Sequence, residues 1–142
     1  MTTSIQWAEL ARAAKAASEQ AYAPYSKFPV GVAVQAQSGK IYTGCNVENA
    51  SYGGTVCAER NAIAAAVVAG ERTFSAVMVY TPQDKLTPPC GICRQVIAEF
   101  FTPNAPIASC NHLQQQQLWT LGELLPAAFT PTYLANSTKV GA

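Results

Sequence analysis

Apolar residues along this chain switch several times between a helical and a strand-like period. Between residues 7 and 21 they recur at steps of three and four, which predicts an amphipathic helix that the turn at Pro24 must end. Residues 30–34 alternate valine with small residues, and residues 41–47 are rich in β-formers. The pair Ser38-Gly39 lies between them, so the two segments predict strands joined by a tight turn.

Five later segments continue the alternation. They predict a helix over residues 57–69, a strand over 76–80, a helix over 93–101, a strand over 106–110 and a short helix over 121–125. Residues 114–117 are interpreted as a solvated connection, and residues 136–142 as a frayed tail. A hairpin followed by helix-linked strands predicts an α/β fold, a three-layer α/β/α sandwich with a central mixed β-sheet.

Composition limits how such elements can be arranged. A chain of 142 residues with 49% apolar content can build one sizeable core, and we expect a single domain over residues 1–142. Charged residues make up only 12% of the chain, which indicates that part of the surface is buried against other subunits. An alanine-rich monomer is the alternative.

Charge and hydropathy exclude several classes of partner. Nine basic residues balance eight acidic ones and are scattered, so no basic surface for nucleic acid is indicated. Charges interrupt the N-terminal segment, and the longest apolar run, residues 62–69, is too short to span a bilayer. We therefore expect a soluble cytoplasmic protein. Five cysteines in such a chain point to metal binding or catalysis rather than to disulfides.

Three of the cysteines are placed to share one ion. Cys90 and Cys93 lie one helical turn apart at the start of a predicted helix, and Cys57 starts another. Three thiolates would leave one tetrahedral position open for water, which is the arrangement of a catalytic zinc. Glu59, in the first turn after Cys57, could reach that water and carry its proton to a leaving group.

Two other interpretations of the cysteines stay open. A Cys-x-x-Cys pair can be a redox dithiol, although the prolines before Cys90 and the lack of a thioredoxin-like strand weigh against it. A structural zinc would need a fourth ligand, for which the candidates are Cys45, Cys110 and His112. Cys45 and Cys110 fit better as buried thiols, and His112 as a loop residue.

The motif Cys57-Ala58-Glu59-Arg60 followed by Cys90-Gly-Ile-Cys93 resembles the zinc deaminase signature in its all-cysteine form. The likeness extends over nearly the whole chain to the small homotetrameric cytidine deaminases. It is carried by residues 23–28, 46–53, 57–60, 89–96 and 123–126, together with Phe129.

This resemblance implies hydrolytic deamination of cytidine and deoxycytidine to uridine and deoxyuridine plus ammonia, with one Zn²⁺ per chain. Zinc-bound hydroxide would attack C4 of the pyrimidine while Glu59 shuttles the proton to N3 and assists ammonia loss. The substrate would be a free nucleoside, and the reaction would belong to pyrimidine salvage. The enzyme would be a homotetramer whose active sites are shared between subunits.

The resemblance also assigns roles to six further residues. It implies ribose binding by Asn46 and Glu48, base contacts by Phe28, substrate contact by Ala58, stacking on a neighbouring subunit's substrate by Phe129, and compensation of the thiolate charge by Arg60. Taken without the family, these residues have ordinary alternatives: an Asx turn, a surface carboxylate, core aromatics and a surface salt bridge. Arg94 has no assigned role beyond a possible interface salt bridge.

Two rival functions remain. A related zinc deaminase with another aminopyrimidine substrate, such as a blasticidin S deaminase, would carry the same ligand motif, although residues 46–52 and Arg60 favour the nucleoside enzymes. A non-catalytic zinc-stabilised interaction module would keep the ligands without needing Glu59.

Overall fold

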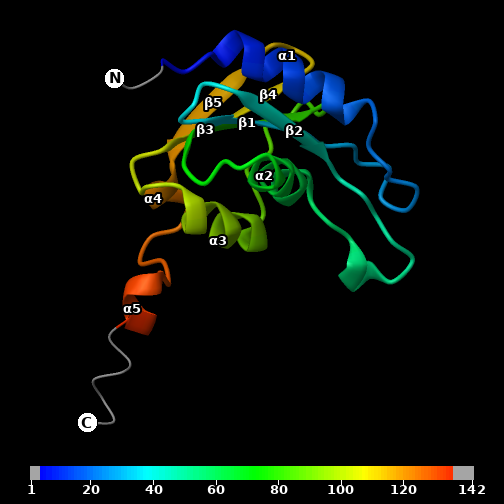
Figure 1. The fold of residues 1–142 in the computed structure, drawn as a ribbon. Helices are drawn as coiled ribbons and strands as arrows, with labels where there is room; N and C mark the ends of the chain where they lie inside the picture. The colour runs from blue at the N-terminus through cyan, green and yellow to red at the C-terminus, as the bar shows by residue number, and fades with distance from the viewer. Residues whose placement is uncertain (1–3, 136–142) are drawn as a thin grey trace.

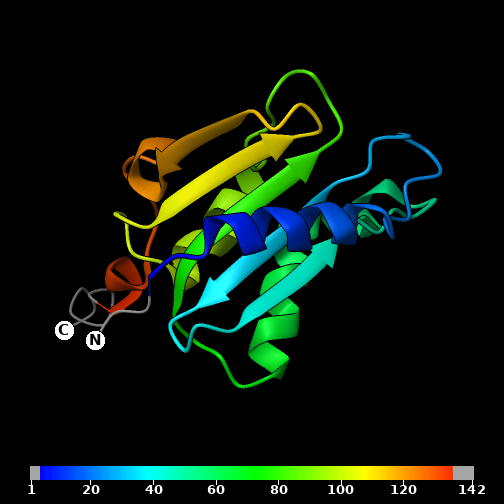
Figure 2. The same cartoon turned by 90° about the horizontal axis from the view of Figure 1, so that it is seen from above.

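The computed structural model describes residues 4–135, which form a sheet between two helical layers (Figure 1). Helix α1 (Trp7–Ser18) packs on one face of the sheet, where it lies across the central strands (Figure 2). Helices α2 (Ala58–Val68) and α3 (Gly91–Phe100) lie on the opposite face. The predicted three-layer α/β/α arrangement is confirmed.

The sheet is mixed, as predicted, with the strand order β2-β1-β3-β4-β5. The strands are β1 (Gly31–Ala36), β2 (Ile41–Cys45), β3 (Phe74–Thr81), β4 (Pro106–Asn111) and β5 (Gln116–Thr120). Among these five strands of the described chain, β3 and β4 pair in parallel, because α3 returns the chain between them, and the other pairs are antiparallel. The β1–β2 turn contains Gly39 at a φ of 92°, a left-handed conformation that glycine adopts without a steric penalty.

One sequence prediction was wrong. Residues 114–117 do not form a solvated connection throughout, because Gln116 begins β5, an edge strand paired with β4. Its first three residues, Gln116, Gln117 and Leu118, are exposed, so hydrophobic periodicity carried little signal there, and the backbone bonds to β4 make the strand. Gln114, at a φ of 60°, makes the turn that leads into it.

The observed helix boundaries differ from the predicted ones at the starts of α2 and α3. Cys57 and Cys90 lie just before α2 and α3 as N-cap residues in extended conformation, rather than inside the helices. The short helix α4 (Leu121–Leu124) is present and begins with a capping box between Thr120 and Glu123. Helix α5 (Pro131–Ala135) was not predicted, and the predicted tail at 136–142 lies outside the described residues.

The core has two parts, one on each face of the sheet. All six residues of β1 are buried, with Val32 and Val34 facing the α2–α3 layer and Ala33 facing α1. Glycine allows α2 to lie very close to the sheet: a Cβ on Gly44 would lie 2.4 Å from the backbone nitrogen of Ala62. This close approach sets the position of α2, and with it the residues at the start of that helix.

Within residues 4–135, no helix combines the length and the hydrophobicity that crossing a bilayer requires.

Candidate metal centre and active site

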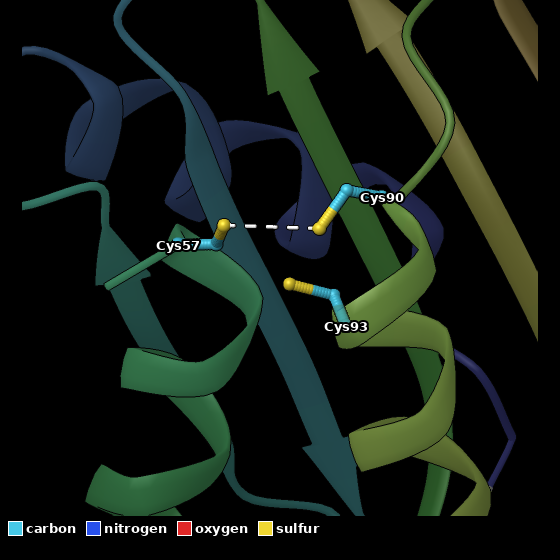
Figure 3. A group of neighbouring side chains, drawn as sticks. All are labelled: Cys57, Cys90 and Cys93. Carbon is cyan, nitrogen blue, oxygen red and sulfur yellow. Dashed lines mark hydrogen bonds between the residues drawn. The ribbon is translucent and has the colours of Figure 1, made fainter. Parts of the chain in front are cut away.

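Three thiols converge where α2 and α3 begin side by side. Cys57 caps α2, Cys90 caps α3, and Cys93 lies in the first turn of α3, so two helix starts supply all three side chains. Their Sγ atoms point toward one another (Figure 3) and all lie within 4.8 Å of each other. All three cysteines are free thiols, which agrees with the prediction that they share a metal ion rather than form disulfides.

The spacing of the sulfur atoms fits zinc. Zn–S bonds of about 2.3 Å in tetrahedral geometry place neighbouring sulfurs about 3.8 Å apart. The Sγ atoms of Cys57 and Cys90 are 3.8 Å apart. Soft thiolates also select zinc over hard cations such as Mg²⁺. Cys57, Cys90 and Cys93 therefore suit a zinc ion with one coordination position left over.

Within residues 4–135, no fourth protein ligand is brought to this centre. Among the described residues, the group able to hold a metal consists of Cys57, Cys90 and Cys93 alone. Cys110 belongs to the core on the α1 side of the sheet, where burial raises the pKa of its thiol to about 11. The imidazole of His112 lies 3.3 Å from the carboxylate of Asp84. A closed structural zinc site is therefore disfavoured.

Two helix N-termini and the Arg60 guanidinium place positive charge next to the three sulfur atoms. Both helix N-termini direct their partial positive charge toward the thiols. The Arg60 guanidinium donates through Nη2 to Cys57 Sγ at 3.7 Å and to the Thr55 carbonyl at 3.3 Å. Hydrogen bonding from Cys93, followed by Arg60, lowers the pKa of Cys57 to about 5. Arg60 is thus placed for the charge compensation that the resemblance implied.

Glu59 lies beside the sulfurs in the first turn of α2. Its side chain is only 5% exposed, and this burial raises the pKa of the carboxyl to about 7. A carboxyl group that titrates near neutrality can accept a proton and return it at the same pH, which is what a proton carrier must do. Its burial and raised pKa make Glu59 a candidate for the predicted proton carrier, and that role stays a prediction.

A small cavity of about 200 Å³ opens in front of the centre. Six residues singled out in the sequence line it: Phe28, Asn46, Cys57, Ala58, Glu59 and Cys90. They come from four separate segments, so only folding brings them together. A separate, larger cavity of about 590 Å³ shares three lining residues with it: Phe28, Thr87 and Pro88.

The two predicted ribose-binding residues differ in their surroundings. Asn46 lines the cavity, and its amide also fixes the preceding segment by accepting from Val30 N and donating to Phe28 O, each at 2.9 Å. Glu48 lines a neighbouring cavity. Its carboxylate accepts hydrogen bonds from the backbone of Tyr25 at 3.0 Å and of Ser26 at 3.1 Å, and from the Ser26 hydroxyl. Both side chains keep acceptor capacity for a further partner.

Phe129 lies outside this cavity, on the segment between α4 and α5. Its side chain is 58% exposed, and its ring stacks on Tyr133 with centroids 5.6 Å apart. In Figure 1 this segment leads away from the sheet, past α3. Phe129 is thus not brought to the site of its own chain.

Sequence reasoning missed the wall formed by Thr87 and Pro88. Ser109 on β4 holds this wall, since its hydroxyl accepts from Thr87 N at 3.2 Å and donates to Thr87 O at 2.9 Å. The prolines before Cys90 were the only available signal. Arg94 also proves to bind backbone carbonyls rather than a carboxylate of this chain: Nε donates to Pro89 O at 2.7 Å and Nη1 to Leu124 O at 2.9 Å.

Comparisons with known proteins agree with this geometry. Residues 5–109 match the family described as the cytidine and deoxycytidylate deaminase zinc-binding region. A cytidine deaminase of Sporosarcina psychrophila is 48% identical over 125 residues, covering 88% of this chain and 92% of that protein. One from Mycobacterium tuberculosis is 38% identical over 125 residues, covering 88% of this chain and 90% of that protein.

A solved structure gives the same fold. The crystal structure of cytidine deaminase from Burkholderia pseudomallei superposes with a TM-score of 0.84 at 45% sequence identity. The match covers 88% of this chain and 100% of that one.

Proposed function

Since this chain belongs to the cytidine and deoxycytidylate deaminase family, we propose that it is a zinc-dependent hydrolase that converts cytidine and deoxycytidine to uridine and deoxyuridine plus ammonia. The observation that carries the proposal is the meeting of three thiols and one buried carboxyl group on a single cavity. Cys57, Cys90 and Cys93 hold one zinc ion per chain. When bound, the ion supplies a nucleophile at neutral pH by acidifying a water molecule.

Glu59 moves the protons of the reaction. Its carboxylate takes a proton from the water and delivers it to N3 of the pyrimidine ring, which makes C4 more electrophilic. Once the water oxygen has bonded to C4, the carboxylate takes the remaining proton of that oxygen and carries it to the amino group, so that the C4–N bond breaks, ammonia leaves and C4 becomes a carbonyl. The low exposure of Glu59 keeps bulk water from competing for these protons.

Four further residues are proposed to hold the nucleoside. Phe28 and Ala58 contact the base from the walls of the cavity, and Asn46 and Glu48 bind the ribose hydroxyls. Asn46 would use the donor and acceptor left over after its bonds to Phe28 and Val30. A net charge of +1, with the basic residues scattered along the sequence, favours a free nucleoside over a base within a nucleic acid.

Phe129 is proposed to serve a second chain. Its exposure, and its absence from the lining of its own chain's cavity, support a role in which the ring stacks on the pyrimidine bound by a neighbour. We propose a homotetramer with shared active sites. Cytoplasmic pyrimidine salvage is the proposed setting.

The test is the loss of ultraviolet absorbance when the purified protein is mixed with cytidine, deoxycytidine, blasticidin S or cytosine. We expect rapid loss with the two nucleosides alone, and none after zinc is stripped. Reaction with blasticidin S alone would replace the proposal by the rival deaminase. No loss with any compound, in protein holding one zinc per chain, would favour the non-catalytic zinc module.

Glu59→Gln separates an enzyme from a zinc module. The substitution keeps the size of the side chain and removes the proton carrier, so turnover should fall by about 10²- to 10⁴-fold while zinc stays bound. Glu99→Gln, which neutralises an exposed carboxylate on α3, is the matched control and should leave turnover unchanged.

A further inference from the structure

The segment that contains Phe129 is hydrogen-bonded to α3, the helix that Cys90 caps and that contains Cys93. Gln95 donates through Nε2 to the carbonyl oxygen of Phe129 at 2.9 Å. Its neighbour Arg94 donates through Nη1 to the carbonyl oxygen of Leu124 at 2.9 Å. Both residues directly follow Cys93, so two consecutive side chains of α3 hydrogen-bond to the two ends of residues 124–129.

Arg94 ties this segment to the ligand loop as well. Helical side chains point back toward the N-terminus, which brings Arg94 Nε within 2.7 Å of Pro89 O, the carbonyl just before Cys90. The Pro89 side chain is fully buried and Leu124 is nearly so. A guanidinium presents its donors in a rigid fork, so the same group fixes both carbonyls at a set separation.

The backbone conformation of residues 124–129 needs contacts from outside the segment to maintain it. Ala127 has a φ of 52°, the left-handed region that disfavours a residue with a side chain. Such a conformation persists only where the surroundings impose it. The bonds from Arg94 and Gln95 lie on either side of Ala127 along the chain and provide that constraint.

We propose that Arg94 and Gln95 are positioning residues that hold residues 124–129 at a set place relative to the zinc ligands and thereby aim Phe129 at the substrate of a neighbouring chain. This inference rests on the proposed function, in which Phe129 stacks on the pyrimidine. It means that the helix bearing the ligands of one active site also determines the geometry of another.

Gln95→Leu tests the proposal, because it removes the donor and keeps the size of the side chain. The KM for cytidine should rise about fivefold, the factor by which one ordinary hydrogen bond changes an equilibrium, while kcat stays within about twofold and zinc stays at one per chain. Gln117→Leu, on the exposed edge strand β5, is the matched control and should leave KM unchanged.

A double variant shows whether Gln95 acts through Phe129. If it does, Gln95→Leu combined with Phe129→Ala should have the same KM as Phe129→Ala alone. Additive effects on KM, or an unchanged KM in Gln95→Leu, would overturn the proposal. Arg94→Lys should also raise KM, because one ammonium group cannot match the fork that reaches both Pro89 and Leu124.

Hydrogen exchange gives a readout that does not depend on activity. The amides of Leu125 and Tyr133, which donate to Leu121 O at 2.8 Å and to Thr130 O at 3.1 Å, flank the restrained segment. In Gln95→Leu these two amides should exchange about fivefold faster than in Gln117→Leu, with the amides of α2 unchanged. Equal exchange rates in Gln95→Leu and Gln117→Leu would show that Gln95 does not restrain residues 124–129. If the wild-type chain failed to deaminate cytidine, the proposed function would fall, and the exchange rates would still decide whether Arg94 and Gln95 hold this segment.

Discussion

Gly44→Ala is expected to destabilise the protein and to disturb the active site from a distance. Gly44 lies on β2, where α2 approaches the sheet most closely. A Cβ at this position would lie 2.4 Å from Ala62 N and 2.6 Å from Ala58 O. Both atoms are helix backbone, so the added methyl group cannot be accommodated by a change of rotamer.

The size of the effect follows from these distances. Ordinary contact needs about 3.4 Å, so α2 would have to move away from β2 by roughly 1 Å. Overpacking of this kind costs about 1–3 kcal/mol, which in a domain of this size lowers the Tm by about 3–10 °C. Because Cys57 and Glu59 lie at the start of α2, a displacement of about 1 Å could lower kcat by about 10²-fold.

Thermal unfolding followed by circular dichroism measures the first effect, and the cytidine assay measures the second. Gly53→Ala is the matched control for stability, since a Cβ there would meet nothing within 4 Å. It should melt within about 1 °C of the wild type. If Gly44→Ala also melted with the wild type and kept its kcat, close packing of α2 against β2 would not position the site.

Three further changes test the site. Arg60→Ala should weaken zinc binding or turnover by about 10- to 100-fold with little effect on folding. Arg72→Ala, at an exposed arginine, should leave zinc binding and turnover unchanged. Unchanged zinc content and turnover in Arg60→Ala would refute charge compensation. Ser26→Ala removes a hydroxyl that holds Glu48 and should raise the KM for cytidine about fivefold, which an unchanged KM would contradict. Removal of zinc by a chelator should lower the Tm by about 10 °C or more, because the ion joins α2 and α3, and an equal Tm would argue against that link.

Local sequence patterns were sufficient for most of the architecture. The changes of period predicted α1, the β1–β2 hairpin and the helix-linked strands, because each of these elements has its own pattern of burial. Strand β5 was not predicted because three of its five residues are exposed glutamine and leucine at the sheet edge, where backbone pairing rather than side-chain burial makes the strand. Helix α5 has no buried residue and therefore no burial pattern to detect.

The sequence also predicted which residues could form the metal centre. A cysteine at each of two helix starts and a second thiol one turn later can meet if the helices begin side by side, so the spacing offered a three-thiol site with Glu59 next to it, beside a redox dithiol and a structural zinc. The specific substrate came from resemblance over most of the chain, since spacing describes a metal site and says little about what binds in front of it.

Tertiary structure decided what surrounds that centre. Thr87 and Pro88 became walls of the cavity because Ser109, on another strand, holds the loop in place. Arg94 and Gln95 are linked to residues 124–129 by hydrogen bonds across some thirty residues of sequence. Residue types and local periods specify which groups are available and which elements they occupy, but contacts between distant segments depend on how the layers pack, and no local pattern records that.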